Sequence, residues 1–129
     1  MKKLLAFIAF MALVVACQES LEEKAAREAK TYTQKNCPLK FSETMMIDSM
    51  TFDKATHTFH YYYTMMGPAD TIAAVDEEQS RTVLLEQLRN STHLKVYKDE
   101  GYRFHYLYRS QKNPQTVYID KTFGEKDYQ

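Results

Sequence analysis

The first seventeen residues set the size of the protein that can fold. Met1-Lys2-Lys3 carries positive charge, and residues 4–12 form an uninterrupted apolar run. Such a run is too short to cross a hydrocarbon layer of ~30 Å as a helix, so it predicts an export signal and not a transmembrane segment. Removal of residues 1–16 leaves 113 of the 129 residues, which is enough for a single domain over residues 17–129.

The residues that follow the apolar run predict a lipid anchor. Leu13-Val14-Val15-Ala16-Cys17 resembles the lipobox of bacterial lipoproteins, which is cut after a small residue such as Ala16. The resemblance implies that Cys17 becomes the N-terminus and carries diacylglycerol and an N-acyl chain such as palmitate. Several acyl chains hold a protein firmly on a membrane, whereas one chain gives only reversible attachment. The alternative is an ordinary signal peptide with a cysteine placed there by chance.

The residues after Cys17 bear on where the protein is sorted. Gln18 stands where enterobacterial lipoproteins retained in the inner membrane carry Asp, so the resemblance implies transfer to the outer membrane. Glu19, Glu22 and Glu23 resemble surface-export signals of some Gram-negative anaerobes. They also suit the acidic first turn of a helix, so the periplasmic and cell-surface sides both stay open.

Composition narrows the class of function. The signal contains Lys2 and Lys3, so the mature part has 15 Lys and Arg against 17 Asp and Glu. A formal charge of −2 excludes the basic footprint of a nucleic-acid binder. Ten Tyr residues and only six Gly and Pro residues favour a sheet-rich globular domain over a disordered chain.

Once Cys17 is acylated, Cys37 is the remaining thiol, so no intramolecular disulfide can form. Cys37 is then buried, paired with a second chain or reactive, and burial at a helix end is favoured. Asn36-Cys37-Pro38 has no neighbouring His or helix N-terminus that would lower the thiol pKa, which argues against a catalytic cysteine.

Local patterns predict two helices and about five strands. Ser20 and Glu23 form a capping box for a helix that ends before Pro38, and Asp76 is the N-cap of a second helix that ends near Asn90. Apolar alternation and turn residues predict strands over 44–52, 57–66, 94–97, 102–109 and 116–121, and a frayed polar tail over 124–129.

Two strands resemble each other. Residues 59–63 read Phe-His-Tyr-Tyr-Tyr and residues 104–108 read Phe-His-Tyr-Leu-Tyr, which suggests two αββ units, although convergence on one strand pattern explains it equally well. The predicted fold is α+β, with element order α-β-β-α-β-β-β and an antiparallel sheet that has both helices on one face. The other face is left free for function.

The sequence does not predict an enzyme. No Ser lies in a G-x-S-x-G elbow, and three glycines do not supply a phosphate-binding loop. The adjacent carboxylates Glu77 and Glu78 suit the first turn of a helix. His57 and His60 lie three apart on one strand and so point to opposite faces, and spacing places no further ligands, so we expect no metal site and no cofactor beyond the lipid.

The candidate binding residues lie on the two similar strands. Alternation puts Tyr61, Tyr63, Tyr106 and Tyr108 on the buried face and Tyr62 on the open face. Tyr97 and Tyr118 are further candidates for the open face. His60 and His105 hold equivalent positions and would meet if their strands were neighbours. A platform for a protein or a glycan is predicted from Tyr62, His60, His105 and Arg109; ordinary cross-strand packing is the alternative.

The lipobox, the short helix, Asn36-Cys37-Pro38 and the hairpin that carries residues 48–52 and 59–63 resemble small uncharacterised lipoproteins of Gram-negative anaerobes. The repeated layout is also similar to periplasmic inhibitor and outer-membrane assembly modules. The resemblance implies a lipid-anchored, non-enzymatic interaction or assembly module with an envelope partner. The alternative is a surface lipoprotein that binds a glycan or another ligand through an aromatic sheet face.

Overall fold

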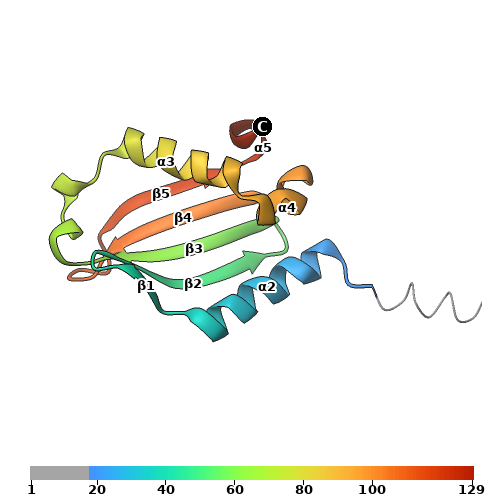
Figure 1. Cartoon of the computed structure of the whole chain (residues 1–129), viewed down its shortest axis with the longest axis horizontal. Coiled ribbons are helices and arrows are strands. Elements are labelled where there is room, and N and C mark those ends of the chain that lie inside the picture. Colours follow the sequence, from blue (N-terminus) through green and yellow to red (C-terminus); the bar gives the residue numbers. More distant parts are fainter. Residues whose placement is uncertain (1–17) are drawn as a thin grey trace, which may run out of the picture.

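The computed structural model describes residues 18–129. The predicted signal peptide, its cleavage residue Ala16 and the lipidation residue Cys17 lie outside the described residues. The described chain is one α+β unit whose helices border and cover a sheet (Figure 1). Its elements are α2 (Leu21–Asn36), β1 (Leu39–Ser42), β2 (Met45–Asp53), β3 (Thr58–Met65), α3 (Glu77–Asn90), α4 (Lys95–Asp99), β4 (Arg103–Ser110), β5 (Val117–Phe123) and α5 (Glu125–Tyr128), with short 3-10 turns η1 (Gly67–Ala69), η2 (Ile72–Ala74) and η3 (Thr92–Leu94).

The five strands lie in the order in which they occur in the sequence, β1-β2-β3-β4-β5. The predicted α+β class and five-strand sheet are confirmed, and so is the hairpin of β2 and β3. The expectation of an antiparallel sheet was wrong at one position, because β3 and β4 pair in parallel. Parallel neighbours need a crossover that returns the chain to the starting edge, and α3 and α4 form part of that connection.

The parallel pair also decides the meaning of the internal resemblance. Phe59 pairs with Phe104, and each following residue pairs with its counterpart up to Tyr63 and Tyr108. Strand β4 is preceded by helix α4, whereas β3 is preceded by strand β2, so the two similar segments do not hold equivalent places in two αββ units. The two similar segments are adjacent strands whose like side chains lie side by side.

All four helices of residues 18–129, and not two, contribute to a core on one face of the sheet. Ala25 of α2, Leu88 of α3, Tyr97 of α4 and Tyr128 of α5 are buried in one cluster with the aromatic side chains of β3 and β4. The predicted capping box of α2 is present, since Ser20 and Glu23 each bond the backbone of the other. Asp76 caps α3 by accepting from the backbone of Gln79.

Three further predictions were wrong. Residues 94–97 form the end of η3 and the start of α4, because Leu94 and Tyr97 both reach the core at a helical spacing while Val96 is 42% exposed. The predicted strands omitted β1, a four-residue strand whose side chains are all exposed. The tail is not frayed, since it forms α5 and buries Tyr128.

Among the helices of the described residues, none has the length and apolar character needed to cross a membrane.

Candidate functional site

The predicted binding residues share the sheet face opposite the helical core. Residues alternate between faces along a strand, so His60 and Tyr62 of β3 lie on the same face as His105 and Arg109 of β4. His60 is directly opposite His105, whereas Arg109 is paired with Thr64, four positions further along the strands. The structure therefore brings together three of the four predicted residues and leaves Arg109 apart from them.

His60 and His105 form a hydrogen-bonded pair. Their Nδ1 atoms are 2.7 Å apart, and Nε2 of His105 is 2.6 Å from Oδ1 of Asp120. A carboxylate only accepts, so Nε2–H of His105 donates to Asp120 and leaves Nδ1 of neutral His105 with a lone pair. Nδ1–H of His60 therefore donates to His105, and the three side chains form a directed chain of hydrogen bonds.

The surroundings of His60 disfavour its protonation. Burial and the neighbouring imidazole of His105 lower the pKa of His60 below its ordinary value of 6.5, and the carboxylate of Asp53 opposes this shift. A doubly protonated pair would face two N–H groups toward each other, which the short Nδ1–Nδ1 distance does not allow. The pair is therefore built to be neutral or to carry a single charge.

Tyr62 packs against the imidazoles and does not stand free as a platform. Its ring centroid is 6.1 Å from that of His60, with the rings nearly parallel, and 6.3 Å from that of His105, with the rings perpendicular. The side chain is half-buried. Arg109, beyond Leu107, has a buried Nε that lacks a hydrogen-bond partner among the described residues.

On the helical face, the parallel pairing stacks like aromatic rings in a ladder. The ring centroids of Tyr61 and Tyr106 are 5.0 Å apart and those of Tyr63 and Tyr108 are 4.4 Å apart, with the planes within 11° of parallel. The prediction that these four tyrosines line the buried side is confirmed. Burial raises the pKa of Tyr63 to about 12, so its hydroxyl stays protonated at neutral pH.

Tyr61 and Tyr63, the two ladder residues on β3, line a groove that no sequence pattern predicted. The groove lies between α2 and η3 and has a volume of about 360 Å³. No local pattern signals it, because it depends on how α2 and η3 are placed over the sheet. We call it the tyrosine groove, and it is lined by Glu28, Tyr32, Phe41, Ile47, Met50, Phe59, Tyr61, Tyr63, His93 and Leu94.

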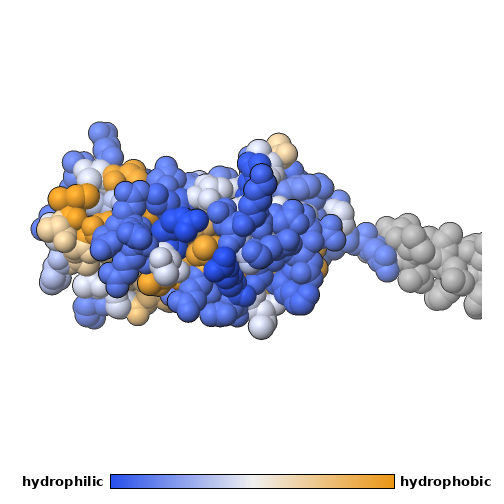
Figure 2. Space-filling model, turned by 90° about the horizontal axis from the view of Figure 1, so that it is seen from above, coloured by the Kyte–Doolittle hydropathy of each residue, from blue (hydrophilic) through white to orange (hydrophobic). Residues whose placement is uncertain are grey.

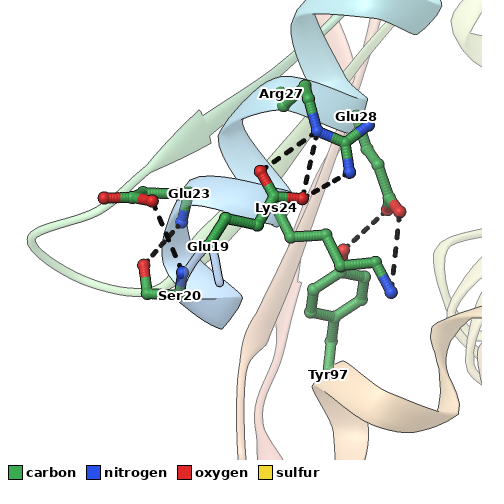
Figure 3. A network of polar contacts seen from close by, with 7 residues as sticks. All are labelled: Glu19, Ser20, Glu23, Lys24, Arg27, Glu28 and Tyr97. Carbon is green, nitrogen blue, oxygen red and sulfur yellow. Dashed lines mark hydrogen bonds and ion pairs between the residues drawn. The ribbon is translucent and has the colours of Figure 1, made fainter. Parts of the chain in front are cut away.

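Glu28, which lines the tyrosine groove, belongs to a set of polar contacts along α2 that reaches Tyr97 of α4 (Figure 3). Tyr97 of α4 donates its hydroxyl to Oε2 of Glu28 on α2, at 2.6 Å. Lys24 lies 3.9 Å from the other oxygen of Glu28, and Arg27 is paired with Glu19 at 2.6 Å. Burial and the bond to Glu28 raise the pKa of Tyr97. Tyr97 was a candidate for the open face, and this prediction was wrong, since Tyr97 is 1% exposed and its bond to Glu28 ties α4 to α2.

Tyr118 and Cys37, which the sequence also singled out, both have contacts that stabilise the fold. Tyr118 is half-buried and donates to Asp70, a buried carboxylate that also accepts from the backbone of Lys112. Cys37 is a half-buried free thiol just after α2. Burial raises the pKa of Cys37, and Asp48 adds to the shift, so the thiol is protonated at neutral pH and is not an activated nucleophile.

Comparison with solved structures finds the same fold in two pilotins of type II secretion systems and in a secreted protein. The pilotin EpsS of the Vibrio vulnificus type 2 secretion system matches with a TM-score of 0.67 and 13% identity, over 84% of this chain and 92% of that one. A candidate secreted protein of Pseudomonas aeruginosa matches with a TM-score of 0.67 and 10% identity, over 87% of this chain and 100% of that one. The type II secretion pilotin AspS of Vibrio cholerae matches with a TM-score of 0.62 and 17% identity, over 83% of this chain and 91% of that one. At these identities the likeness is one of fold.

Sequence comparisons add one finding. A search of curated proteins gave no significant match. A family model matches residues 20–119, which include the capping box, β1 to β4, the groove and the histidine pair. That match covers most of the chain, and the protein therefore belongs to the family described as a domain of unknown function, DUF8479.

Proposed function

We propose that the mature protein is a lipid-anchored, non-enzymatic module of the cell envelope that docks a partner protein in the tyrosine groove. The observation that carries the proposal is the groove itself. Its lining combines aliphatic and aromatic side chains with the polar groups of its tyrosines and the carboxylate of Glu28. This combination suits an apolar segment with polar flanks, such as one face of an amphipathic helix.

Exposed apolar side chains lie at the end of the domain away from Gln18. Phe41 lines the groove and is 51% exposed, and Ile72 and Val117 are 68% and 46% exposed. They belong to β1, η2 and the start of β5, which lie at the end opposite α4 (Figure 1). Figure 2 shows hydrophobic residues gathered at this end, while the rest of the visible surface is mainly hydrophilic. A partner that binds there would meet the domain at the end away from Gln18.

The comparisons support an assembly role in the envelope. Two of the solved structures that share the fold are pilotins of type II secretion systems, so the fold serves this kind of machinery in other proteins. The lipobox supports attachment through Cys17, and Gln18 in place of Asp supports the outer membrane. The partner would then be an envelope protein, whether the domain faces the periplasm or the cell surface.

Site-specific photo-crosslinking in intact cells tests the groove. A photoreactive residue replaces Phe41 in the groove, and a matched control replaces Val96, which is 42% exposed on α4. We expect a protein adduct from position 41 and none from position 96. His93 is exposed and lines the groove, so His93→Glu in the same chain should abolish the adduct at position 41 without unfolding the domain.

Two results would overturn the proposal. One is an adduct that forms equally from both positions or persists with His93→Glu, which would show contact without a specific groove. The other is an adduct at position 41 that contains only glycan or lipid, which would favour the alternative of a ligand-binding lipoprotein. In both cases the purified His93→Glu protein must keep the unfolding midpoint of the wild type.

A further inference from the structure

We infer that His60 and His105 form a binding site for a divalent transition-metal ion, such as Zn²⁺ or Cu²⁺, on the open face of the sheet. Neutral imidazole is a preferred ligand of both ions. The parallel, in-register pairing of β3 and β4 projects the two rings from neighbouring positions on one face. The site is independent of the tyrosine groove, which lies on the opposite face.

The distances fit an ion held between the two Nδ1 atoms. Bonds of about 2.0–2.1 Å in tetrahedral geometry would separate the two nitrogens by roughly 3.3 Å. The observed separation is 2.7 Å, so a ring opening of roughly half an ångström would convert the hydrogen bond into a chelate. A torsional adjustment of two half-buried side chains allows such a change, because the face carries no helix over the rings.

Asp120 prepares His105 to act as a ligand. Because Nε2–H of His105 donates to the Asp120 carboxylate, the lone pair of His105 is on Nδ1, the atom that faces His60. The arrangement of carboxylate, histidine and metal recurs in metal sites, where it orients the ring and raises its basicity. His60 would move its proton from Nδ1 to Nε2 when the metal binds, so a neutral pair loses no proton to solvent.

The charged groups near the histidine pair are two carboxylates, which favour a bound cation, and one Arg, which opposes it. Asp120 bonds His105, and Asp53 acts electrostatically on His60. Arg103 lies two positions before His105 on the same face and is exposed. Within residues 18–129 no third His, Cys, Asp or Glu is placed to bind the same ion, so water would complete the coordination and the site would be open. An open two-histidine site predicts modest affinity compared with a closed structural zinc site.

Calorimetric titration of the full lipidated protein in detergent with Zn²⁺, and separately with Cu²⁺, tests the site. We expect one ion per chain with micromolar affinity at pH 7.5. His60→Ala and His105→Ala should each weaken binding at least tenfold, and Asp120→Asn should weaken it several-fold through the His105 ring. The matched controls are His93→Ala and Cys37→Ser, which remove other metal-binding side chains and should leave the affinity unchanged.

Nuclear magnetic resonance of the wild type keeps the test valid if a variant fails to fold. On addition of Zn²⁺, the ring signals of His60 and His105 should shift together, and the ring proton of His60 should appear on Nε2. No binding at 1 mM Zn²⁺ or Cu²⁺ would overturn the inference. So would binding that either control variant abolishes, or ring signals of His60 and His105 that stay unchanged while another histidine shifts.

Discussion

The hydroxyl of Thr33 on α2 makes two hydrogen bonds with one residue of β2, Met50. Oγ1 accepts from the Met50 N–H at 2.9 Å and donates to the Met50 carbonyl at 2.8 Å. Strand β1 pairs with β2 only up to Ile47, so this part of the β2 edge has no strand beside it. One side chain therefore satisfies the two backbone groups that a neighbouring strand would have bonded, and holds α2 along the exposed edge.

Thr33→Val should lower the free energy of unfolding by about 1–3 kcal/mol, because valine keeps the shape but leaves a half-buried N–H and carbonyl unpaired. Urea unfolding of the purified protein measures the loss. Thr33→Ser keeps the hydroxyl and is the matched control, and we expect it to retain most of the stability. Equal losses in the two variants would show that the methyl group, and not the two hydrogen bonds, is what matters.

Tyr97→Phe should lower the free energy of unfolding by about 1 kcal/mol. The change removes the bond to Glu28, while water can partly re-solvate that carboxylate because it is exposed. Lys24→Gln removes the exposed 3.9 Å ion pair to the same carboxylate and should cost less than about 0.5 kcal/mol. Thermal unfolding measures both losses. A larger loss of stability in Lys24→Gln than in Tyr97→Phe would contradict the prediction that the hydrogen bond contributes more than the ion pair.

Acidification should destabilise the protein through His60. The pKa of His60 in the folded protein is below the value of 6.5 expected in the unfolded chain, so the unfolded chain binds more protons between the two pKa values. The contribution of His60 is complete above pH 6.5 and is lost as the pH falls through the folded pKa. Urea unfolding at intervals from pH 8 to pH 5 should show this decline in the free energy of unfolding. In His60→Asn the free energy of unfolding should fall less steeply with decreasing pH.

Tyr128→Ala should lower the free energy of unfolding by about 3–5 kcal/mol. Tyr128 is 8% exposed, its hydroxyl donates to the Tyr102 carbonyl at 2.8 Å, and its ring packs edge-on against Phe104. Lys126→Ala changes an exposed residue of the same short helix and should leave the unfolding midpoint almost unchanged. Similar small effects from both variants would mean that α5 contributes little to the core.

Cys17→Ser should abolish acylation and release the protein from membranes, because the thiol is the predicted site of the lipid. Intact mass and membrane flotation measure the two effects, and Cys37→Ser is the matched control that should stay acylated. A Cys17→Ser protein that still floats with membranes would show another mode of attachment. Protease treatment of intact and lysed cells, applied to the wild type, would then identify the side on which the domain lies.

Local sequence patterns determined the elements whose signals are contained within a few residues. The Ser20–Glu23 capping box, the Asp76 cap and the alternation along residues 57–66 and 102–109 each predict their own structure, because caps and strand faces depend on near neighbours. Leu94 to Tyr97 shows the limit of such patterns. A short apolar run fits a strand or a helix, and contact with the core selected the helix.

The sequence by itself determined which aromatic residues share a face of β3 and of β4, because that follows from the two-residue period of any strand. Only the tertiary structure decided that β3 and β4 are parallel neighbours, since the connection through α3 and α4 sets which strands meet. That one pairing stacks Tyr63 on Tyr108 and places His60 within hydrogen-bond distance of His105. It also packs Tyr61, which lines the tyrosine groove, against Tyr106. These contacts join residues about 45 positions apart in the sequence, so no pattern of near neighbours can predict them.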